Sequence, residues 1–265
     1  MQQSPIPAEP YNGEIDRAEA LGRLRAEVAA VEARQQRSDA LPFGLAAIDD
    51  RLGGGGLEGA GLHEIAAASP GLNDDAAATL FAAGIAARFA GAPDATALWA
   101  LTRFDLYAPG LEQAGLGPER VVYAQGRDDA AVLALAEDAL RDRAFSAVVA
   151  EVKRIGQAAT RRLQLAAADS ETPLLLLRRW ARRDRPPLDE PSLAVTRWRI
   201  GSAPSVPLGI PGVGRACWSV DLVRQRGGNP FSLLVEACDA TGLLALPSAA
   251  SHRAAVAGGA LVRAA

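Results

Sequence analysis

The sequence is poor in the residues on which many catalytic and secreted proteins depend. Lys153 is the single lysine among 28 Lys and Arg residues, and His63 and His252 are the two histidines. The two cysteines, Cys217 and Cys238, have neither a zinc-site spacing nor the density of a disulfide framework, so we expect reduced thiols. With two histidines, a Ser-His-Asp triad or a histidine-ligated metal site is not expected, and we expect no metal.

Targeting signals and long apolar runs are also missing. Residues 1–13 have no basic start and no apolar core, so we expect no signal peptide. The longest apolar stretch, residues 76–90, is interrupted by Arg88 and is too short to span a bilayer. A net charge of −3 argues against a protein that coats nucleic acid, so any DNA contact would come from a local patch. We expect a soluble, cytoplasmic protein with no membrane partner.

Strand and helix patterns alternate through the middle of the chain. We predict strands over residues 61–67, 96–102, 119–125, 144–152 and 173–178. Helices are predicted from Asn73 to about Ala90, from Asp128 to about Arg143, and around residues 160–168. Continuous apolar strands between amphipathic helices are typical of a mostly parallel sheet covered on both faces. Three more strands follow in residues 194–200, 217–226 and 231–238, and the turn at residues 227–230 joins the last two as an antiparallel hairpin.

The two ends of the chain differ from this core, which we place at residues 41–246. Residues 1–40 are predicted to be a mobile N-terminus and an amphipathic helix over residues 14–37. The apolar stripe of that helix would dock on a partner or on the domain itself, and it consists of Leu21, Leu24, Val28 and Val31. Residues 38–60 are interpreted as a glycine-rich connector, and residues 247–265 as a flexible tail.

The turn after the first strand is where such a fold usually binds phosphate. A nucleotide-binding loop needs the pattern GxxxxGK[ST], whereas this turn is AAASPGLNDDAAATL around Asn73, Asp74 and Asp75. The carboxylates of Asp74 and Asp75 can cap the helix in place of a phosphate. A carboxylate about 4 Å from a phosphate oxygen opposes binding by roughly 4 kcal/mol. The loop therefore predicts no nucleotide cofactor and no catalytic residue.

A second acidic position follows from the same fold. The fourth strand ends in Glu151, where related folds carry a magnesium ligand. Because the lysine and the Ser/Thr of the phosphate loop are missing, we expect Glu151 to be a structural, ion-paired carboxylate.

An arginine cluster after the fifth strand is the clearest candidate binding site. Guanidinium groups with an interleaved tryptophan can grip phosphates and stack a base, or they can dock a partner protein. A solvated loop paired with Asp184, Asp189 and Glu190 is the structural alternative. The candidate DNA-binding or partner-binding residues are Arg178, Arg179, Trp180, Arg182, Arg183 and Arg185. Arg224 and Arg226 lie two apart on a predicted strand, so both should project from one face as a further candidate interface.

The order of these features resembles the core of RecA-like ATPases. LPFGLAAIDDRLGGGGLEGAGLHEI (residues 41–65) is similar to the segment that leads into RecA's phosphate loop. WSVDLVRQRGGNPFSLLVEA (residues 218–237) is similar to RecA's closing hairpin, where Arg224 and Arg226 match two lysines that reach the neighbouring subunit's nucleotide. The resemblance covers residues 41–245 and implies a RecA-like fold.

Within that superfamily the sequence resembles the ImuA family, RecA-like accessory proteins of the bacterial damage-induced mutasome. The motifs that carry this resemblance are LYAPGLEQAGL (106–116), TRRLQLAAA (160–168), TRWRIGSAPS (196–205) and LVRQRGG (222–228). The resemblance implies a protein of the SOS response that supports error-prone translesion synthesis. It implies two partners, an ImuB-type Y-family polymerase homologue and an error-prone replicative-type DNA polymerase, with RecA and single-stranded DNA as further candidates.

Departures from RecA favour binding over catalysis. Arg103 or a neighbour stands where RecA carries its catalytic glutamate, and a short KRIGQAA segment replaces the first DNA-binding loop. We therefore expect a non-catalytic adaptor rather than an ATPase. Two alternatives stay open: a modulator of RecA filaments or cell-division-inhibitor-like protein, and an unorthodox DNA-dependent ATPase that uses backbone amides with Arg224 or Arg226.

Overall fold

A computed structural model of the chain describes residue 22, residues 40–206, residue 212 and residues 214–247. The predicted helix over residues 14–37, with its stripe of Leu21, Leu24, Val28 and Val31, lies outside the described residues. The same holds for residues 248–265 of the predicted tail.

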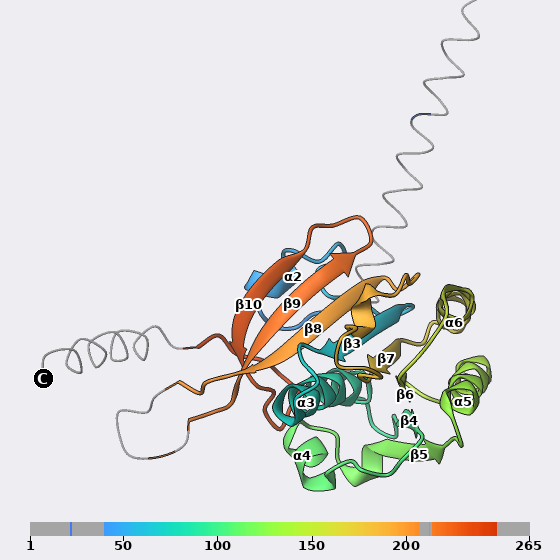
Figure 1. Ribbon diagram of the computed structural model, residues 1–265, viewed down its shortest axis with the longest axis horizontal. Coiled ribbons are helices and arrows are strands. Elements are labelled where there is room, and N and C mark those ends of the chain that lie inside the picture. The colour runs from blue at the N-terminus through green and yellow to red at the C-terminus, as the bar shows by residue number, and fades with distance from the viewer. Residues whose placement is uncertain (1–21, 23–39, 207–211, 213, 248–265) are drawn as a thin grey trace, which may run out of the picture.

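The centre of the structure is a mixed, eight-stranded sheet (Figure 1). The strands lie in the order β10-β9-β8-β3-β7-β6-β4-β5. All pairs from β8 to β5 are parallel, whereas β9 pairs antiparallel with both β8 and β10. The strands are β3 (Leu62–Ala67), β4 (Ala97–Leu101), β5 (Val121–Gln125), β6 (Ala147–Val152), β7 (Leu174–Arg178), β8 (Thr196–Ala203), β9 (Cys217–Gln225) and β10 (Phe231–Glu236). The predicted α/β class, a mostly parallel sheet flanked by helices with a C-terminal antiparallel hairpin, is confirmed.

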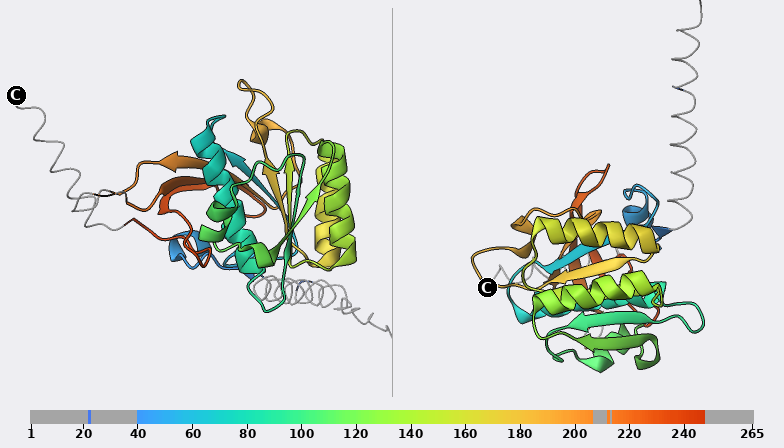
Figure 2. Two further views of the ribbon diagram at one scale, coloured as in Figure 1. Left: turned by 90° about the horizontal axis from the view of Figure 1, so that it is seen from below. Right: turned by 90° about the vertical axis from the view of Figure 1, so that its right-hand side faces the viewer.

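Helices cover both faces of the parallel part of the sheet (Figure 2). Helix α3 (Leu72–Phe89) packs on one face, and the short α4 (Ala108–Gln113) packs against α3. Helices α5 (Asp129–Asp142) and α6 (Gln157–Ser170) cover the other face. Short 3-10 turns occur at Pro118–Arg120 and Pro187–Asp189. None of the described helices is both long and apolar enough to cross a membrane.

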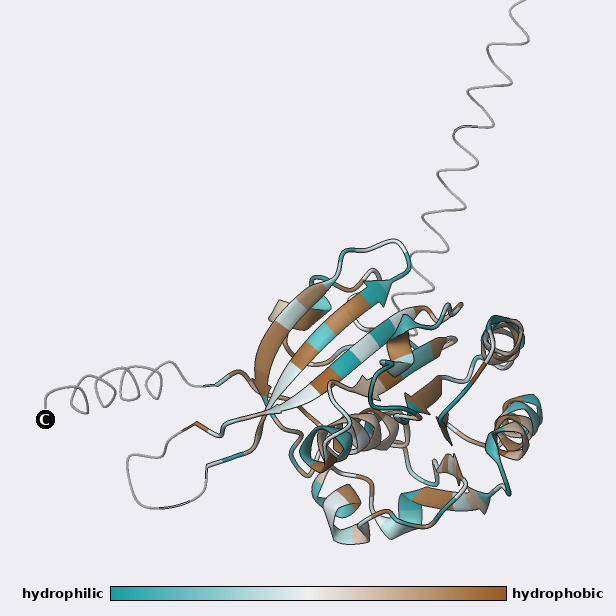
Figure 3. Ribbon diagram, viewed as in Figure 1, coloured by the Kyte–Doolittle hydropathy of each residue, from teal (hydrophilic) through white to brown (hydrophobic). Residues whose placement is uncertain are grey.

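Alternation along the buried strands explains why both faces need a cover. Successive side chains of a strand point to opposite faces. On β4, Trp99 and Leu101 enter the core under α3, whereas Leu98 enters the core under α5 and α6. β6 and β7 divide in the same way, with Val149 under α3 and Val148 under the other pair. Figure 3 shows the corresponding bands of hydrophilic and hydrophobic residues along β8, β9 and β10.

Both ends of α5 follow the signals in the sequence. Asp128 caps α5, because its carboxylate accepts a hydrogen bond from the backbone N–H of Ala131 at 2.8 Å. The helix ends at Arg143, which has a left-handed backbone with φ of 52°. The predicted bounds of this helix are therefore confirmed to within one residue.

The predicted glycine-rich connector is more ordered than the sequence indicated. It contains β1 (Ala40–Leu41), α2 (Ala46–Asp49) and β2 (Leu57–Glu58), and β1 pairs antiparallel with β2. The Asp49 carboxylate accepts hydrogen bonds from three backbone N–H groups at 2.6–3.1 Å. The buried side chains of this segment that extend the core are Phe43, Ile48, Leu52 and Leu57. The interpretation as a mere connector is therefore wrong, because this apolar content anchors the segment.

Candidate functional site

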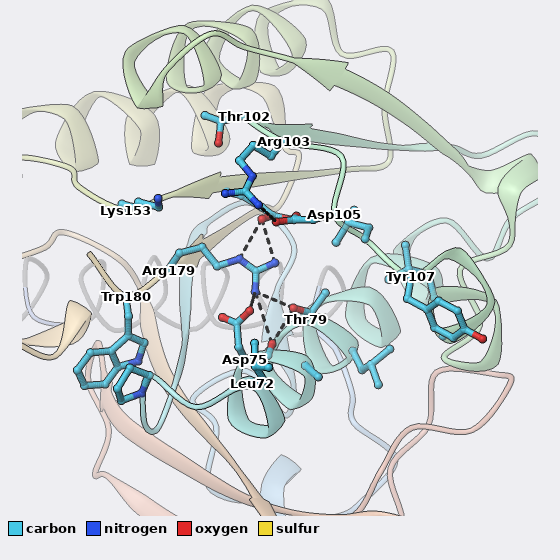
Figure 4. A pocket seen from close by; sticks show the side chains of 17 residues that line it. Leu72, Asp75, Thr79, Thr102, Arg103, Asp105, Tyr107, Lys153, Arg179 and Trp180 are labelled. Atoms are coloured by element: carbon cyan, nitrogen blue, oxygen red, sulfur yellow. Dashed lines mark hydrogen bonds and ion pairs between the residues drawn. The ribbon is translucent and has the colours of Figure 1, made fainter. Parts of the chain in front are cut away.

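A cavity opens at the carboxyl edge of the parallel strands, the usual place for a site in this kind of sheet (Figure 4). Its volume is about 640 Å³. The walls come from the first turns of α3, the loop between β4 and α4, α4 itself, and the ends of β6 and β7. The side chains that line it include Leu72, Asp75, Thr79, Leu80, Thr102, Arg103, Asp105, Leu106, Tyr107, Leu111, Glu151, Lys153, Arg179 and Trp180.

An ion-paired guanidinium forms one wall of this cavity. Arg179 contacts the Asp75 carboxylate through Nη1 and the Glu151 carboxylate through Nη2, both at 2.9 Å. Its Nη1 also donates to Thr79 Oγ1 at 2.8 Å, and Figure 4 shows this arrangement. Burial would lower the pKa of the guanidinium, but the charges of Glu151 and Asp75 outweigh it and raise the pKa above its ordinary value. One cation thus ties α3, β6 and β7 together.

Glu151 is ion-paired, as the sequence predicted. Besides its contact with Arg179, it accepts a hydrogen bond from Trp99 Nε1 at 2.6 Å, and its side chain is 9% exposed. These contacts join the end of β6 to β4 and to the residue after β7.

The start of α3 is built differently from the prediction. Asp74 and Asp75 were expected to cap their own helix, but the N-cap is Gly71 and no side chain caps it. Asp74 instead accepts hydrogen bonds from the backbone N–H of Ser202 at 2.7 Å and from its hydroxyl at 2.9 Å. Partial burial would raise the pKa of Asp74, but hydrogen bonds from Ser69 and Ser202 outweigh it and lower the pKa. Both carboxylates therefore join α3 to its neighbours, and the capping interpretation is wrong.

A glycine on β8 lies beside this contact. A Cβ at Gly201 would lie 2.6 Å from the Oγ of Ser219, its cross-strand partner on β9, and 3.2 Å from the Ala68 Cβ. A larger residue would therefore force the Ser219 side chain and the segment at Ala68 to shift.

The arginine cluster does not form one surface. Arg178 is 1% exposed, and its guanidinium contacts Glu64 at 3.0 Å and Glu190 at 2.7 Å. Arg197 approaches the other oxygen of Glu64 at 2.6 Å and donates to the backbone oxygen of Glu190 at 2.8 Å. Among the fully buried polar side-chain atoms of the described residues, Nε of Arg178 is the one without a hydrogen-bond partner. Arg178 is thus a core residue, because it is the last residue of the buried strand β7.

Two further members of the cluster are turned inward in part. The Arg179 side chain is 16% exposed in the ion-paired position described above. Trp180 donates from Nε1 to the backbone oxygen of Ala67 at 3.0 Å and packs against the core, so it is not a free stacking surface. The exposed part of the predicted cluster is the remainder, Arg182, Arg183 and Arg185.

Two of these exposed arginines, Arg182 and Arg185, line a second, smaller cleft of about 240 Å³. They lie opposite each other across a tight turn, with an exposed ion pair between Arg182 and Asp184 at 3.0 Å. Lys153 and Arg154, from the loop after β6, also line the cleft. These two were not predicted, because they precede the arginine cluster by 24 or more residues along the chain.

Arg224 and Arg226 lie at the end of β9 and in the turn after it. Strand β9 ends at Gln225, so Arg226 is the first residue of the turn rather than a strand residue as predicted. Both arginines are exposed and Gln225 between them is buried, which agrees with the alternation that the prediction used. Arg224 donates to the backbone oxygen of Ser192 at 2.6 Å. That the two arginines form an interface stays a prediction.

The start of α3 and the loop after β4 carry exposed side chains that were not among the predicted site residues. Leu72 is 86% exposed, Tyr107 is 74% exposed and Phe104 is 59% exposed. Arg103, in the place of the expected catalytic glutamate, is 76% exposed and lies 3.5 Å from Asp105. The sequence did contain a signal for this site: two aromatic residues, Phe104 and Tyr107, follow closely after the buried strand β4.

Cysteine and histidine contribute no further site among the described residues. Cys217 and Cys238 are free, and burial raises the pKa of the Cys238 thiol to about 12. Within residues 40–206 and 214–247, no three His, Cys, Asp or Glu residues are grouped so as to hold a metal ion.

Together, the strand order and the pocket define an α/β protein with a mostly parallel sheet, in which an arginine links α3 to the acidic end of β6. No protein-family model matches the chain. Protein ImuA from two strains of Caulobacter vibrioides is 37% identical to it over 211 residues, which cover 76% of this chain and 84% of that protein. The chain belongs to the ImuA family.

A solved structure also resembles part of the chain. It is the crystal structure of SulA from Pseudomonas aeruginosa, with 29% sequence identity and a TM-score of 0.37. The match covers 44% of this chain and 96% of that one.

Proposed function

We propose that this member of the ImuA family is a non-catalytic, RecA-like adaptor that supports error-prone translesion DNA synthesis after DNA damage. It acts in the cytoplasm as part of the SOS response, by binding an ImuB-type Y-family polymerase homologue and an error-prone replicative-type polymerase. RecA and single-stranded DNA are further candidate partners. Membership of the ImuA family supports the role in DNA damage and mutagenesis.

The single observation that carries the non-catalytic part is the position of Arg179. A RecA-like ATPase needs a phosphate-loop lysine, a hydroxyl for Mg²⁺ and an acidic residue at the end of the fourth strand. Here the only lysine of the chain, Lys153, lies after β6, and the Thr79 hydroxyl and the Glu151 carboxylate both bind the Arg179 guanidinium. This set of donors and acceptors does not fit ATP with Mg²⁺. The contacts of Arg179 therefore support a protein that binds partners rather than one that hydrolyses nucleotide.

Two measurements on the full chain test this proposal. Calorimetric titration with Mg-ATP, with and without single-stranded DNA, is expected to give no saturable heat. In a strain that lacks its own ImuA-family protein, the chain is expected to restore damage-induced mutagenesis only when the ImuB-type protein is present. Saturable nucleotide binding with turnover would overturn the non-catalytic part, and full mutagenesis without the chain would overturn the adaptor role.

A further inference from the structure

We propose that the large pocket and the smaller basic cleft form one docking groove for an acidic segment of a partner protein that carries a large apolar side chain. This inference rests on the proposed adaptor function and assigns a surface and a ligand chemistry to it. The apolar side chain would enter the pocket beside α3 and α4, and the acidic side chains would lie along the basic cleft.

The rim of the pocket is apolar and open to solvent. Leu72 and Tyr107 are the two most exposed large apolar side chains of the described residues, and they face the same cavity from α3 and from the loop before α4. Exposed apolar groups gathered at a cavity are typical of a binding site, because the folded chain gains nothing from leaving them in water.

The inner wall of the pocket is suited to an aliphatic or aromatic side chain. Leu80, Leu106 and Leu111 line it, and Trp180 lies at the side toward β7. The charged groups beside them, Asp75, Glu151 and Arg179, already satisfy one another. An apolar group that enters therefore leaves no charge without its partner, which is the condition for a favourable buried contact.

The adjoining cleft has the opposite character. Four cationic side chains line it against one carboxylate, Glu190, which already contacts Arg178 at 2.7 Å; the four are Lys153, Arg154, Arg182 and Arg185. Lys153 lines both cavities, so the two are neighbours and one extended segment can reach both. The excess of positive charge is complementary to carboxylates.

The backbone under these cations is held in place. The Asp129 carboxylate, in the first turn of α5, accepts hydrogen bonds from the N–H of Lys153 at 3.2 Å and of Arg154 at 3.0 Å. The turn that carries Arg182 and Arg185 is closed by a β-bridge between them. A positioned backbone lowers the ordering cost of binding.

A protein segment fits this groove better than a nucleic-acid strand. The phosphates of a strand are evenly spaced, so some would come close to Asp75, Asp105 and Glu151 in the pocket. A peptide can place its carboxylates at the basic cleft alone and its apolar side chain at the leucines. The groove therefore favours an acidic, apolar protein segment.

The test measures binding of a labelled peptide of about a dozen residues, with a central Leu-Phe pair flanked by Asp and Glu, to the full chain by fluorescence anisotropy. We expect saturable binding that weakens at least about tenfold in Leu72→Ser with Tyr107→Ser, and by a similar factor in Arg154→Glu. The matched controls lie on α6: Leu165→Ser, also an exposed leucine, and Arg161→Glu, also an exposed arginine, are expected to bind as wild type.

A peptide with Lys in place of Asp and Glu, and a single-stranded oligonucleotide, complete the design. Absence of saturable binding of the acidic peptide up to about 1 mM overturns the inference, as does equal weakening by the α6 controls. Tighter binding of the oligonucleotide, lost in the same groove variants, also overturns it. If these outcomes occur while the chain still binds the ImuB-type protein, only the groove is refuted and the adaptor function stands.

Discussion

The arginines on the two sides of Trp180 have opposite environments. Arg178 lies at the end of a buried strand, 1% exposed, and shares Glu64 with Arg197. Arg182, four residues later, is 62% exposed and forms an exposed ion pair with Asp184. The arginine-rich stretch at residues 178–185 thus has a structural half and a surface half, because β7 ends at its first residue.

The two halves differ in what their charges contribute. A buried ion pair that loses one partner leaves an uncompensated charge away from water, which costs several kcal/mol. An exposed pair of the same residue types contributes at most about 1 kcal/mol, since water and salt screen it. Substitutions in the inner half should therefore change folding, and those in the outer half should change binding.

The largest effect is expected from Glu64→Gln. This change keeps the shape of the side chain but leaves Arg178 and Arg197 without their shared carboxylate, so we expect a loss of about 3–5 kcal/mol in the free energy of unfolding. Urea denaturation measures it. The matched control is Asp184→Asn, which removes the exposed partner of Arg182 and should change stability by less than about 0.5 kcal/mol. Equal effects of the two variants would refute the division.

A buried histidine next to this network gives the next effect. His63 is fully buried, with Nε2 at 2.8 Å from the Glu58 backbone oxygen and Nδ1 at 2.7 Å from Thr196 Oγ1. Trp198 Nε1 donates to the same Thr196 oxygen at 2.7 Å, so the hydroxyl donates to Nδ1 and Nε2 carries the proton. Burial lowers the pKa of His63 from 6.5 to about 4, although the hydrogen bond to Glu58 opposes it.

This shift predicts a loss of stability in acid. The unfolded chain takes up a proton at His63 as the pH falls below 6.5, whereas the folded chain stays neutral there until about pH 4. The contribution is thus fully present above pH 6.5 and declines by about 3 kcal/mol as the pH falls to about 4. Urea denaturation of the wild type and His63→Asn over this range measures it. The difference between the two proteins should shrink in acid, and parallel curves would contradict the prediction.

Arg179 stands between the two halves and should have an intermediate effect. Arg179→Ala leaves Asp75 and Glu151 facing each other across the pocket, with side chains 40% and 9% exposed. We expect a loss of about 2 kcal/mol, smaller than for Glu64→Gln because Asp75 is partly solvated. Thermal unfolding measures it. Adding Asp75→Asn should recover part of the loss, and a further loss in the double variant would contradict the electrostatic explanation.

Much of the fold was predictable, because apolar strands and capped helices are local signals. The short α4 was not predicted, since Pro109 and Gly110 lie inside it and both disfavour helix on intrinsic propensity. The inward turn of Arg178 was not predictable either, because its partner Glu64 lies 114 residues earlier in the chain. A charged residue inside the apolar strand LHEIAA was the only local sign that a buried counter-charge was needed.

The smallest effect on stability, with a large one on binding, is expected from Arg182→Glu combined with Arg183→Glu. Both side chains lie in the exposed half, so thermal unfolding should shift by no more than about 0.5 kcal/mol in free energy. Binding to the ImuB-type partner should weaken at least about tenfold, because reversed charges repel a carboxylate-rich segment at the basic cleft. Pull-down and anisotropy measure it, with Arg161→Glu on α6 as the control. If the double variant binds as the wild type does, the outer arginines are not part of the interface. The cluster would then have only the structural role of its inner half.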